Sequence, residues 1–269
     1  MDAKAILKRT MWRAAQMPPL GRALIGYYEL KSSASGWTRE HPYDRANGVQ
    51  TSGFIPGRVL RSDGSNAYLG AQPSIVRRAL TAIPDPADCH FLDLGCGKGR
   101  ALLVATEFGF ASITGVELSA TLSAIARRNA AVFARTHPDR TPIHVVTGDA
   151  LTHRLPQTNL VIFLYNPFHR PLMSQLLLNI EGSIRATGRE IYIVYYNPTW
   201  ADVLDASYAL ERRYAAQLAY DPVEIGYGPD QSDAVVIWQN RGNPQPHPPG
   251  DPTVAVTVVS PGIRVEINE

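Results

Sequence analysis

The stretch between positions 91 and 119 contains three closely spaced glycines, with one acid just before them and another near its end. The glycines are Gly95, Gly97 and Gly99, which follow the apolar run that contains Asp93. Glycine lets a ligand approach backbone N–H groups closely, because it has no Cβ. Glu117 ends the next apolar run, where a carboxylate can accept hydrogen bonds from both hydroxyls of a ribose. The stretch therefore predicts a nucleoside-binding turn.

Two departures separate this turn from the dinucleotide-binding fingerprint. Arg100 stands where that fingerprint has its last glycine. Asp93 would repel a pyrophosphate, whereas its carboxylate suits a ligand with an ammonium group. Asp149, at the end of the third apolar run, can accept a hydrogen bond from an exocyclic amine such as that of adenine. An ammonium group, a ribose and an adenine, met in order by three strand ends, describe S-adenosylmethionine rather than a nicotinamide dinucleotide.

From about residue 72 to residue 239 the sequence resembles the class I, seven-strand S-adenosylmethionine-dependent methyltransferases. The segments DLGCGKG, GVEL, GDA and LYNPF together carry the resemblance. It implies that Asp93 and the three glycines surround the methionine part of the cofactor. It also implies that Glu117 with Leu118 holds the ribose and that Asp149 with Ala150 holds the adenine. Tyr68 and Gln72 precede the first strand, where many relatives cover the methionine end, and are implied as further contacts.

The segment FLYNPF, residues 163–168, is similar to the Asn-Pro-Pro-Tyr/Phe element of amino-group methyltransferases, although the second proline is missing. It is also similar to the Asn-Asn-Phe element of seven-strand histone lysine methyltransferases. These resemblances imply that Asn166, beside the cofactor, and the carbonyl of Pro167 accept hydrogen bonds from the target nitrogen. They imply that Phe168 packs on the substrate.

Other polar residues near these motifs leave alternatives open. Tyr195, Tyr196 and Asn197 end the next apolar run, where they frame the acceptor or relay its proton. Alternatively, the two tyrosines are partly buried with satisfied hydroxyls. His169 is either an acid/base group or, as we favour, a helix-start residue. Lys98 either neutralises the cofactor carboxylate or, as we favour, is solvated. The histidines show no ligand spacing with carboxylates or cysteines, so no metal is predicted.

The elements that must position these residues alternate strictly after residue 88. Seven apolar runs are expected to be strands, at 90–95, 112–118, 143–149, 160–166, 190–197, 214–220 and 233–240. Helices are expected after each of the first five, and the last two strands are joined without a helix. This pattern predicts an α/β fold: a doubly wound, mostly parallel seven-stranded sheet with an antiparallel edge strand and an N-terminal helical and loop extension.

The chain divides into three predicted parts. Residues 1–86 are an extension that covers the substrate or contacts a partner, with a basic helix at 5–17, a long loop at 37–66 and a helix at 72–83. Residues 87–240 are the S-adenosylmethionine-binding domain. Residues 241–269 are a proline-rich linker followed by a hairpin or strand pair.

Composition limits the setting of the site. The chain has 269 residues, of which 45% are hydrophobic, which is enough for a full core. The formal charge of +2 does not indicate any class of binding partner. The two cysteines, Cys89 and Cys96, favour a reducing compartment. No apolar run is long enough for a transmembrane span, so a cytoplasmic protein is expected. Oligomeric state is not predicted.

The function that fits these patterns best is N-methylation of an amine, with a protein side chain favoured as acceptor. A nucleic-acid base or a small molecule is the open alternative, because amino-methylating enzymes of bases share the Asn-Pro element. A module that binds S-adenosylmethionine without transferring its methyl group is a second alternative. A nicotinamide dehydrogenase is disfavoured by Asp93 and Arg100.

Overall fold

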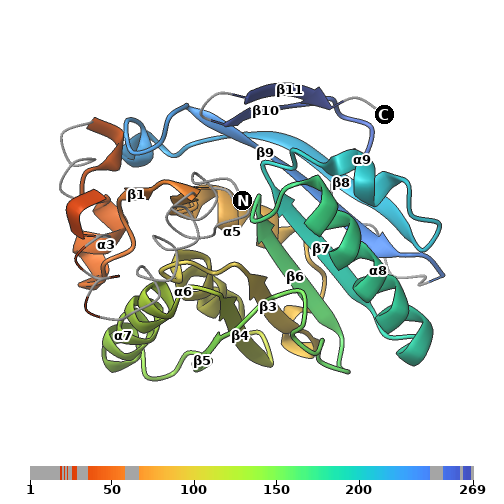
Figure 1. The fold of residues 1–269 in the computed structure, drawn as a ribbon, viewed down its shortest axis with the longest axis horizontal. Helices are drawn as coiled ribbons and strands as arrows, with labels where there is room; N and C mark the ends of the chain where they lie inside the picture. Colours follow the sequence, from red (N-terminus) through yellow and green to blue (C-terminus); the bar gives the residue numbers. More distant parts are fainter. Residues whose placement is uncertain are drawn as a thin grey trace, which may run out of the picture.

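The computed structural model describes residues 36–57, 67–242, 251–260 and 263–267, with a few positions between 19 and 28. Its centre is a seven-stranded sheet in the order β5-β4-β3-β6-β7-β9-β8 (Figure 1). The strands are β3 (His90–Leu94), β4 (Ser112–Glu117), β5 (Ile143–Thr147), β6 (Leu160–Tyr165), β7 (Ile191–Tyr196), β8 (Leu210–Ala219) and β9 (Ser232–Asn240). The first five are parallel, and the sheet ends in the antiparallel pair β9 and β8. The predicted fold class is confirmed.

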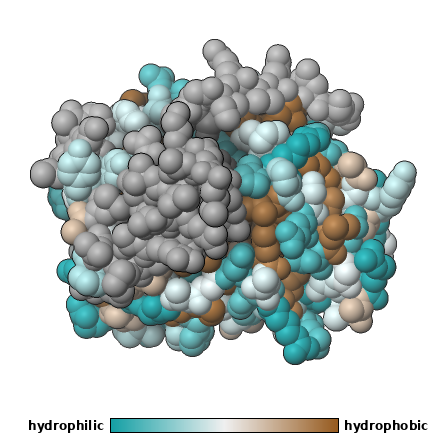
Figure 2. All heavy atoms as spheres, viewed as in Figure 1, coloured by the Kyte–Doolittle hydropathy of each residue, from teal (hydrophilic) through white to brown (hydrophobic). Residues whose placement is uncertain are grey.

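The central strands are apolar throughout because helices cover both faces of the sheet. The helices are α5 (Pro73–Thr81), α6 (Arg100–Ala105), α7 (Ala120–Thr136), α8 (Arg170–Thr187) and α9 (Ala201–Asp205). Alternate residues of one strand enter opposite clusters: Phe91 packs with α5, α6 and α7, whereas Leu92 packs with α8 and α9. On the face drawn in Figure 2, apolar residues gather between β6 and α8. The sheet is thus the middle of three layers.

The C-terminal hairpin extends the layer that contains α8 and α9. It consists of β10 (Val256–Ser260) and β11 (Ile263–Ile267), which pair antiparallel (Figure 1). Val256 and Val258 are buried in the same cluster as Trp238 of β9. The hairpin expected in this region is therefore confirmed, and it packs on the sheet. None of the helices in the described part of the chain combines the length and hydropathy that a bilayer-spanning segment needs.

Two expectations about local structure were wrong. The connection from β5 to β6 forms turns between residues 148 and 159, not a helix. It is short and contains Pro156, and Asn179 of α8 donates to the Leu151 carbonyl at 2.7 Å, which fixes the turn on the sheet. A continuous loop over 37–66 is also contradicted by the 3-10 helix η1 (Gly36–Thr38), α3 (Pro42–Asn47) and the strand β1 (Phe54–Ile55).

The sequence does not predict α3, because the residue that caps the N-terminus of this helix is an unusual one. The ring nitrogen Nδ1 of His41 accepts from the Tyr43 backbone N–H at 3.0 Å, a role that Ser, Thr, Asp or Asn more often fills. The helix predicted at 72–83 is confirmed as α5. The helix expected at 5–17 and most of the proline-rich linker lie outside the described residues.

A segment before the sheet, residues 41–55, is tied to the start of α6 by buried charges. We call it the N-terminal strap. Arg100 donates from Nε to the Thr51 hydroxyl at 2.6 Å, and its Nη2 lies 3.7 Å from the Asp44 carboxylate. Asp44 in turn accepts from the Thr51 backbone N–H at 2.6 Å and from the Ser52 hydroxyl at 2.7 Å. Both charges are almost fully buried, at 4% and 1% exposure.

Two more side chains hold the middle of the strap. Lys98 is fully buried and donates from Nζ to the Ser52 carbonyl at 2.5 Å, so the expectation that it is solvated was wrong. Asn129 of α7 accepts from the Gln50 backbone N–H at 2.9 Å and donates to the Lys98 carbonyl at 2.9 Å. The strap is therefore part of the folded domain rather than an appendage.

Removing one member of the buried pair is expected to destabilise the fold strongly. Arg100→Met leaves the Asp44 carboxylate buried without its cation, which costs about 3–5 kcal/mol of unfolding free energy. Arg45→Met is the matched control, because its pair with Glu40 is exposed and contributes at most about 1 kcal/mol. Urea denaturation of the wild-type protein and the two variants measures the loss of unfolding free energy in each variant. Equal losses would contradict the role given to Arg100.

Candidate active site

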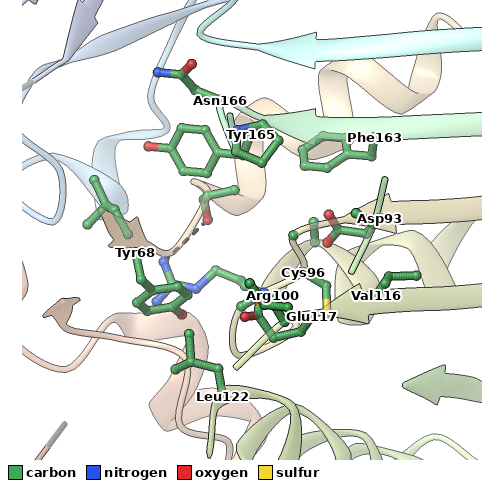
Figure 3. A pocket seen from close by; sticks show the side chains of 18 of the residues that line it. Tyr68, Asp93, Cys96, Arg100, Val116, Glu117, Leu122, Phe163, Tyr165 and Asn166 are labelled. Carbon is green, nitrogen blue, oxygen red and sulfur yellow. Dashed lines mark hydrogen bonds between the residues drawn. The ribbon is translucent and has the colours of Figure 1, made fainter. Parts of the chain in front are cut away.

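A pocket opens at the carboxyl ends of β3, β4 and β6, where open α/β sheets bind ligands. The residues predicted for the site that line it are Tyr68, Asp93, Gly95, Gly97, Glu117, Leu118, Asp149, Ala150, Asn166, Pro167 and Phe168. Figure 3 shows Tyr165 and Asn166 across the pocket from Tyr68 and Arg100. The structure thus brings together side chains that lie up to 100 positions apart in the sequence.

The glycine turn forms the floor of the pocket in a conformation that other residues rarely adopt. Gly95, Gly97 and Gly99 have φ angles of 89°, 55° and 87°. A Cβ on Gly97 would lie 2.3 Å from the ring of Tyr68, and one on Gly95 would lie 2.9 Å from Pro167. Gly99 caps α6 and does not line the pocket. The first two glycines therefore keep the pocket open.

Two carboxylates face the pocket from neighbouring strands. Asp93 and Glu117 are both buried, at 3% and 8% exposure. Burial raises the pKa of Asp93 well above its ordinary value, and the charge of Glu117 raises it further. Burial also raises the pKa of Glu117, although this side chain accepts backbone N–H groups from Gly97 at 2.9 Å and Ser119 at 2.8 Å. A cation bound between the two would offset the free-energy cost of keeping these buried carboxyls ionised.

The donor set therefore fits S-adenosylmethionine, which carries a sulfonium and an ammonium group. Asp149 ends the third predicted run and is half-buried, with its Oδ1 held by the Leu151 backbone N–H at 3.0 Å. Its assignment to the adenine stays a prediction, as does that of Glu117 to the ribose. In the described part of the chain, no three His, Cys, Asp or Glu side chains gather closely enough to hold a metal ion.

The far wall of the pocket is the Asn166-Pro167-Phe168 segment at the end of β6. Asn166 has a left-handed backbone, with φ of 42°, which asparagine tolerates better than most residues. Its Oδ1 accepts from the Tyr195 hydroxyl at 3.3 Å. The carbonyl of Phe168 accepts from the indole N–H of Trp200 at 3.1 Å. His169 is the N-terminal cap position of α8, the interpretation favoured from the sequence.

Three predicted residues do not line the pocket. Gly99 is described above. Gln72 points its side chain to His41, at 3.0 Å, and to the Tyr227 carbonyl, at 2.9 Å. Tyr195 is fully buried in the cluster under α8 and α9, so it reaches the site only through Asn166. The expectation that Tyr195 frames the acceptor is corrected to this indirect contact.

Sequence reasoning missed several lining residues, above all Arg100 and Tyr165. Arg100 was noted only as a missing glycine, although its place at the start of a helix after the glycine turn aims it at the pocket. Tyr165 stacks on Tyr196, with ring centroids 4.3 Å apart. The signal for Tyr165 was strand alternation, because it lies two residues after the pocket-lining Phe163.

The model of the family described as "Methyltransferase domain" matches residues 91–188. This segment contains the glycine turn, both buried carboxylates, Asp149 and the Asn166 element. The chain thus contains a methyltransferase domain. The matched segment runs from β3 to the end of α8 in the seven-stranded sheet, and the carboxylates that line its pocket suit the cationic S-adenosylmethionine.

Several solved structures are similar to this methyltransferase at low sequence identity. One is a candidate class I S-adenosylmethionine-dependent methyltransferase from Listeria monocytogenes, with 15% identity, a TM-score of 0.47 and coverage of 66% of this chain and 61% of that one. Another is a candidate methyltransferase from Escherichia coli, with 17% identity, a TM-score of 0.43 and coverage of 66% and 94%.

An RNA methyltransferase from Salinibacter ruber, in complex with S-adenosyl-L-homocysteine, is similar at 17% identity with a TM-score of 0.41 and coverage of 67% and 99%. The methyltransferase described here thus spans less than two thirds of the Listeria protein and almost all of the Salinibacter protein. No curated protein matches the chain.

Gly97→Ala is expected to weaken cofactor binding roughly tenfold or more, because its Cβ would overlap the Tyr68 ring and force this wall of the pocket to shift. Gly109→Ala is the control: Gly109 has a similar φ of 67°, but a Cβ there would meet nothing within 4 Å. Both variants carry the backbone strain, and only Gly97→Ala closes the site. Calorimetric titration with S-adenosyl-L-homocysteine measures the affinity of each variant. An equal loss of affinity in both would contradict the role given to Gly97.

Cofactor affinity is expected to fall as the pH is lowered through the raised pKa of Asp93. Above that pKa the ionised carboxylates attract the cationic cofactor, and below it one negative charge is lost. Binding near that pKa should therefore release protons. Calorimetry of S-adenosylmethionine binding in buffers of different ionisation enthalpy counts them. Proton uptake, or the same release from Asp93→Asn, would contradict the assignment.

Proposed function

We propose that this methyltransferase transfers its methyl group to an amine nitrogen held at Asn166 and Pro167. The observation that carries the proposal is the contact between Gly95 and Pro167. A Cβ on Gly95 would lie 2.9 Å from the proline ring, so the cofactor turn and the Asn-Pro segment touch. An acceptor bound at this segment would lie beside the methionine end of the cofactor.

The residues of the site would act mainly by alignment. S-adenosylmethionine supplies an electrophilic methyl group on a sulfonium. The Asn166 side chain and the Pro167 carbonyl would accept hydrogen bonds from the amine, which leaves its lone pair aimed into the pocket. Alignment of this kind contributes up to about 7–11 kcal/mol through effective molarity. The buried carboxylates Asp93 and Glu117 would hold the cationic cofactor.

We favour a protein side chain as the acceptor. Nucleic-acid binding relies on Lys and Arg side chains that are available to phosphates. Several exposed arginines of the described surface are instead neutralised by acids, in the pairs Arg45 with Glu40, Arg78 with Asp221 and Arg170 with Asp202. The last of these pairs lies at the start of α8, close to the Asn166 segment.

The alternative acceptor is a nucleic-acid base, since amino-methylating enzymes of bases share the Asn-Pro element. The test is transfer of radiolabelled methyl from S-adenosylmethionine to three pools: protein, RNA and a mixture of small amines. Each pool is offered with and without prior protease or nuclease treatment. Label in the protein pool that protease removes supports the proposal. Label in RNA that nuclease removes would replace it with the alternative, and cofactor binding with no transfer to any pool would favour an inactive binding module.

The division of roles predicts separable variants. Glu117→Ala should weaken cofactor binding, because it removes a carboxylate that lines the pocket. The backbone N–H groups of Gly97 and Ser119 hold this carboxylate in place. Asn166→Ala should leave cofactor affinity nearly unchanged and lower turnover roughly 100-fold through loss of alignment. Calorimetry and the radiolabel assay measure the two effects. If Asn166→Ala loses cofactor affinity as much as Glu117→Ala does, the division is wrong.

A further inference from the structure

The side chain of Tyr165 lies on the face of the sheet that carries the glycine turn. It packs against the cluster that contains Cys96 of this turn and Tyr196, whereas Phe168 belongs to the cluster under α8 and α9. It also lines the pocket, across from Arg100 (Figure 3). Tyr165 therefore stands on the cofactor side of the pocket rather than with the wall where the methyl acceptor is proposed to bind.

Asp93 and Tyr165 extend from neighbouring parallel strands on one face of the sheet. Asp93 of β3 lies opposite Phe163 of β6, and Tyr165 is two residues further along β6. Because side chains alternate along a strand, Tyr165 projects on the same face as Asp93, about 6–7 Å nearer the carboxyl edge of the sheet. The pocket thus presents a carboxylate and, nearer its rim, a phenol.

The ring of Tyr165 is held in place from behind. It stacks on Tyr196, with ring centroids 4.3 Å apart and 26° between the ring planes. The Tyr196 hydroxyl donates to the Asp233 carboxylate at 2.5 Å. The same carboxylate accepts from the Tyr220 hydroxyl at 2.6 Å and from Nδ2 of Asn197 at 2.9 Å. This network fixes Tyr196, and the stack in turn fixes the direction in which the Tyr165 hydroxyl points.

The Tyr165 hydroxyl differs from its neighbours in its hydrogen bonding. The hydroxyls of Tyr196 and Tyr220 both donate to Asp233, whereas that of Tyr165 makes no hydrogen bond to any residue that the structure describes. Burial raises the pKa of Tyr165 well above its ordinary value, the charge of Asp233 raises it further, and Arg100 offsets the rise only in part. The hydroxyl is therefore protonated at neutral pH and can donate to a ligand in the pocket.

Three N–H groups of the glycine turn are already bound within the protein. Those of Gly95 and Cys96 donate to the Val116 carbonyl, at 2.8 and 3.1 Å. That of Gly97 donates to the Glu117 carboxylate at 2.9 Å. An anionic group of a ligand at this turn must therefore find a donor on another segment.

We propose that the Tyr165 hydroxyl binds the carboxylate of the methionine part of S-adenosylmethionine. This carboxylate is the only anionic group of the cofactor, and it accepts hydrogen bonds without donating any. A hydroxyl that donates to an ionised carboxylate forms a charge-assisted hydrogen bond. The ammonium group of the same amino acid would then lie at Asp93, on the neighbouring strand. The inference rests on the cofactor of the proposed function and does not depend on the acceptor.

The experiment compares S-adenosyl-L-homocysteine with its decarboxylated analogue, which keeps the amine and lacks only the carboxylate. Calorimetry gives the two dissociation constants and their ratio, so no methyl acceptor is needed. The wild-type protein should prefer S-adenosyl-L-homocysteine. Tyr165→Phe keeps the ring and its stack on Tyr196, and it should reduce that preference about 10- to 100-fold, as expected for the loss of a hydrogen bond to a charged group.

Tyr192→Phe is the matched control. It removes a hydroxyl from β7 that accepts from Gln239 at 3.0 Å and does not line the pocket, so it should leave the ratio unchanged even if it lowers stability. Tyr165→Phe removes no hydrogen bond within the described part of the chain, so thermal unfolding without ligand should change little. Asp93→Asn should weaken the binding of both ligands without lowering the preference, because both carry the amine.

The outcomes separate two kinds of failure. If the wild-type protein does not bind S-adenosyl-L-homocysteine, the proposed function fails. If it binds both ligands equally, or if Tyr165→Phe keeps the full preference, the carboxylate contact is overturned while the cofactor site stands. A full preference combined with slower methyl transfer would assign the hydroxyl to the acceptor instead. An equal loss of preference in Tyr165→Phe and Tyr192→Phe overturns the contact as well, because the effect is then a general one of the sheet.

Discussion

The buried ion pair of Arg100 and Asp44 is the constraint on which the rest of the site depends. A guanidinium removed from water needs a counter-charge and acceptors for its N–H groups, and only a fixed surrounding supplies both. The Gly70 and Ala71 carbonyls accept from Nη1 at 3.3 Å each, in addition to Thr51 at Nε. One side chain at the start of α6 thereby fixes the strap and the segment after β2 (Tyr68–Leu69).

The ion pair of Arg100 and Asp44 also affects the electrostatics of the pocket. Lys98 and Arg100 lie next to the glycine turn, yet their hydrogen bonds go to the strap, and Arg100 has Asp44 as its counter-charge. Burial raises the pKa values of Asp93 and Glu117, and a cation in the pocket would favour their ionised forms. A pocket in which the nearby cations are already paired selects a cationic ligand. The strap contributes to specificity in this way, although it lies outside the segment that matches the family model.

The part of the site that is local in sequence could be predicted, and the part that depends on tertiary contacts could not. Asp93, Glu117 and Asp149 lie at or near the ends of apolar runs, and these runs together with the positions of the glycines locate the strand ends. Residues 165–167 and 196–198 have the same sequence, Tyr-Asn-Pro, but Asp233 and Ala234 of β9 bind the amide of Asn197, whereas Asn166 lines the pocket. The burial of Lys98 escaped prediction for the same reason, since the acceptor of its hydrogen bond lies 46 positions away.

The contact between Gly95 and Pro167 has a consequence for how the two halves of the site can vary. The proline ring stands where a side chain on Gly95 would lie, so the cofactor turn and the Asn-Pro segment pack against each other and neither can shift far without the other. A change in either main chain alters cofactor binding and acceptor geometry together. Side chains that project from these rigid segments, such as Glu117 and Asn166, can change without moving the main chain. Separable effects on binding and turnover are therefore a property of side-chain substitutions, and new acceptor specificity is most easily gained at the wall beyond Asn166.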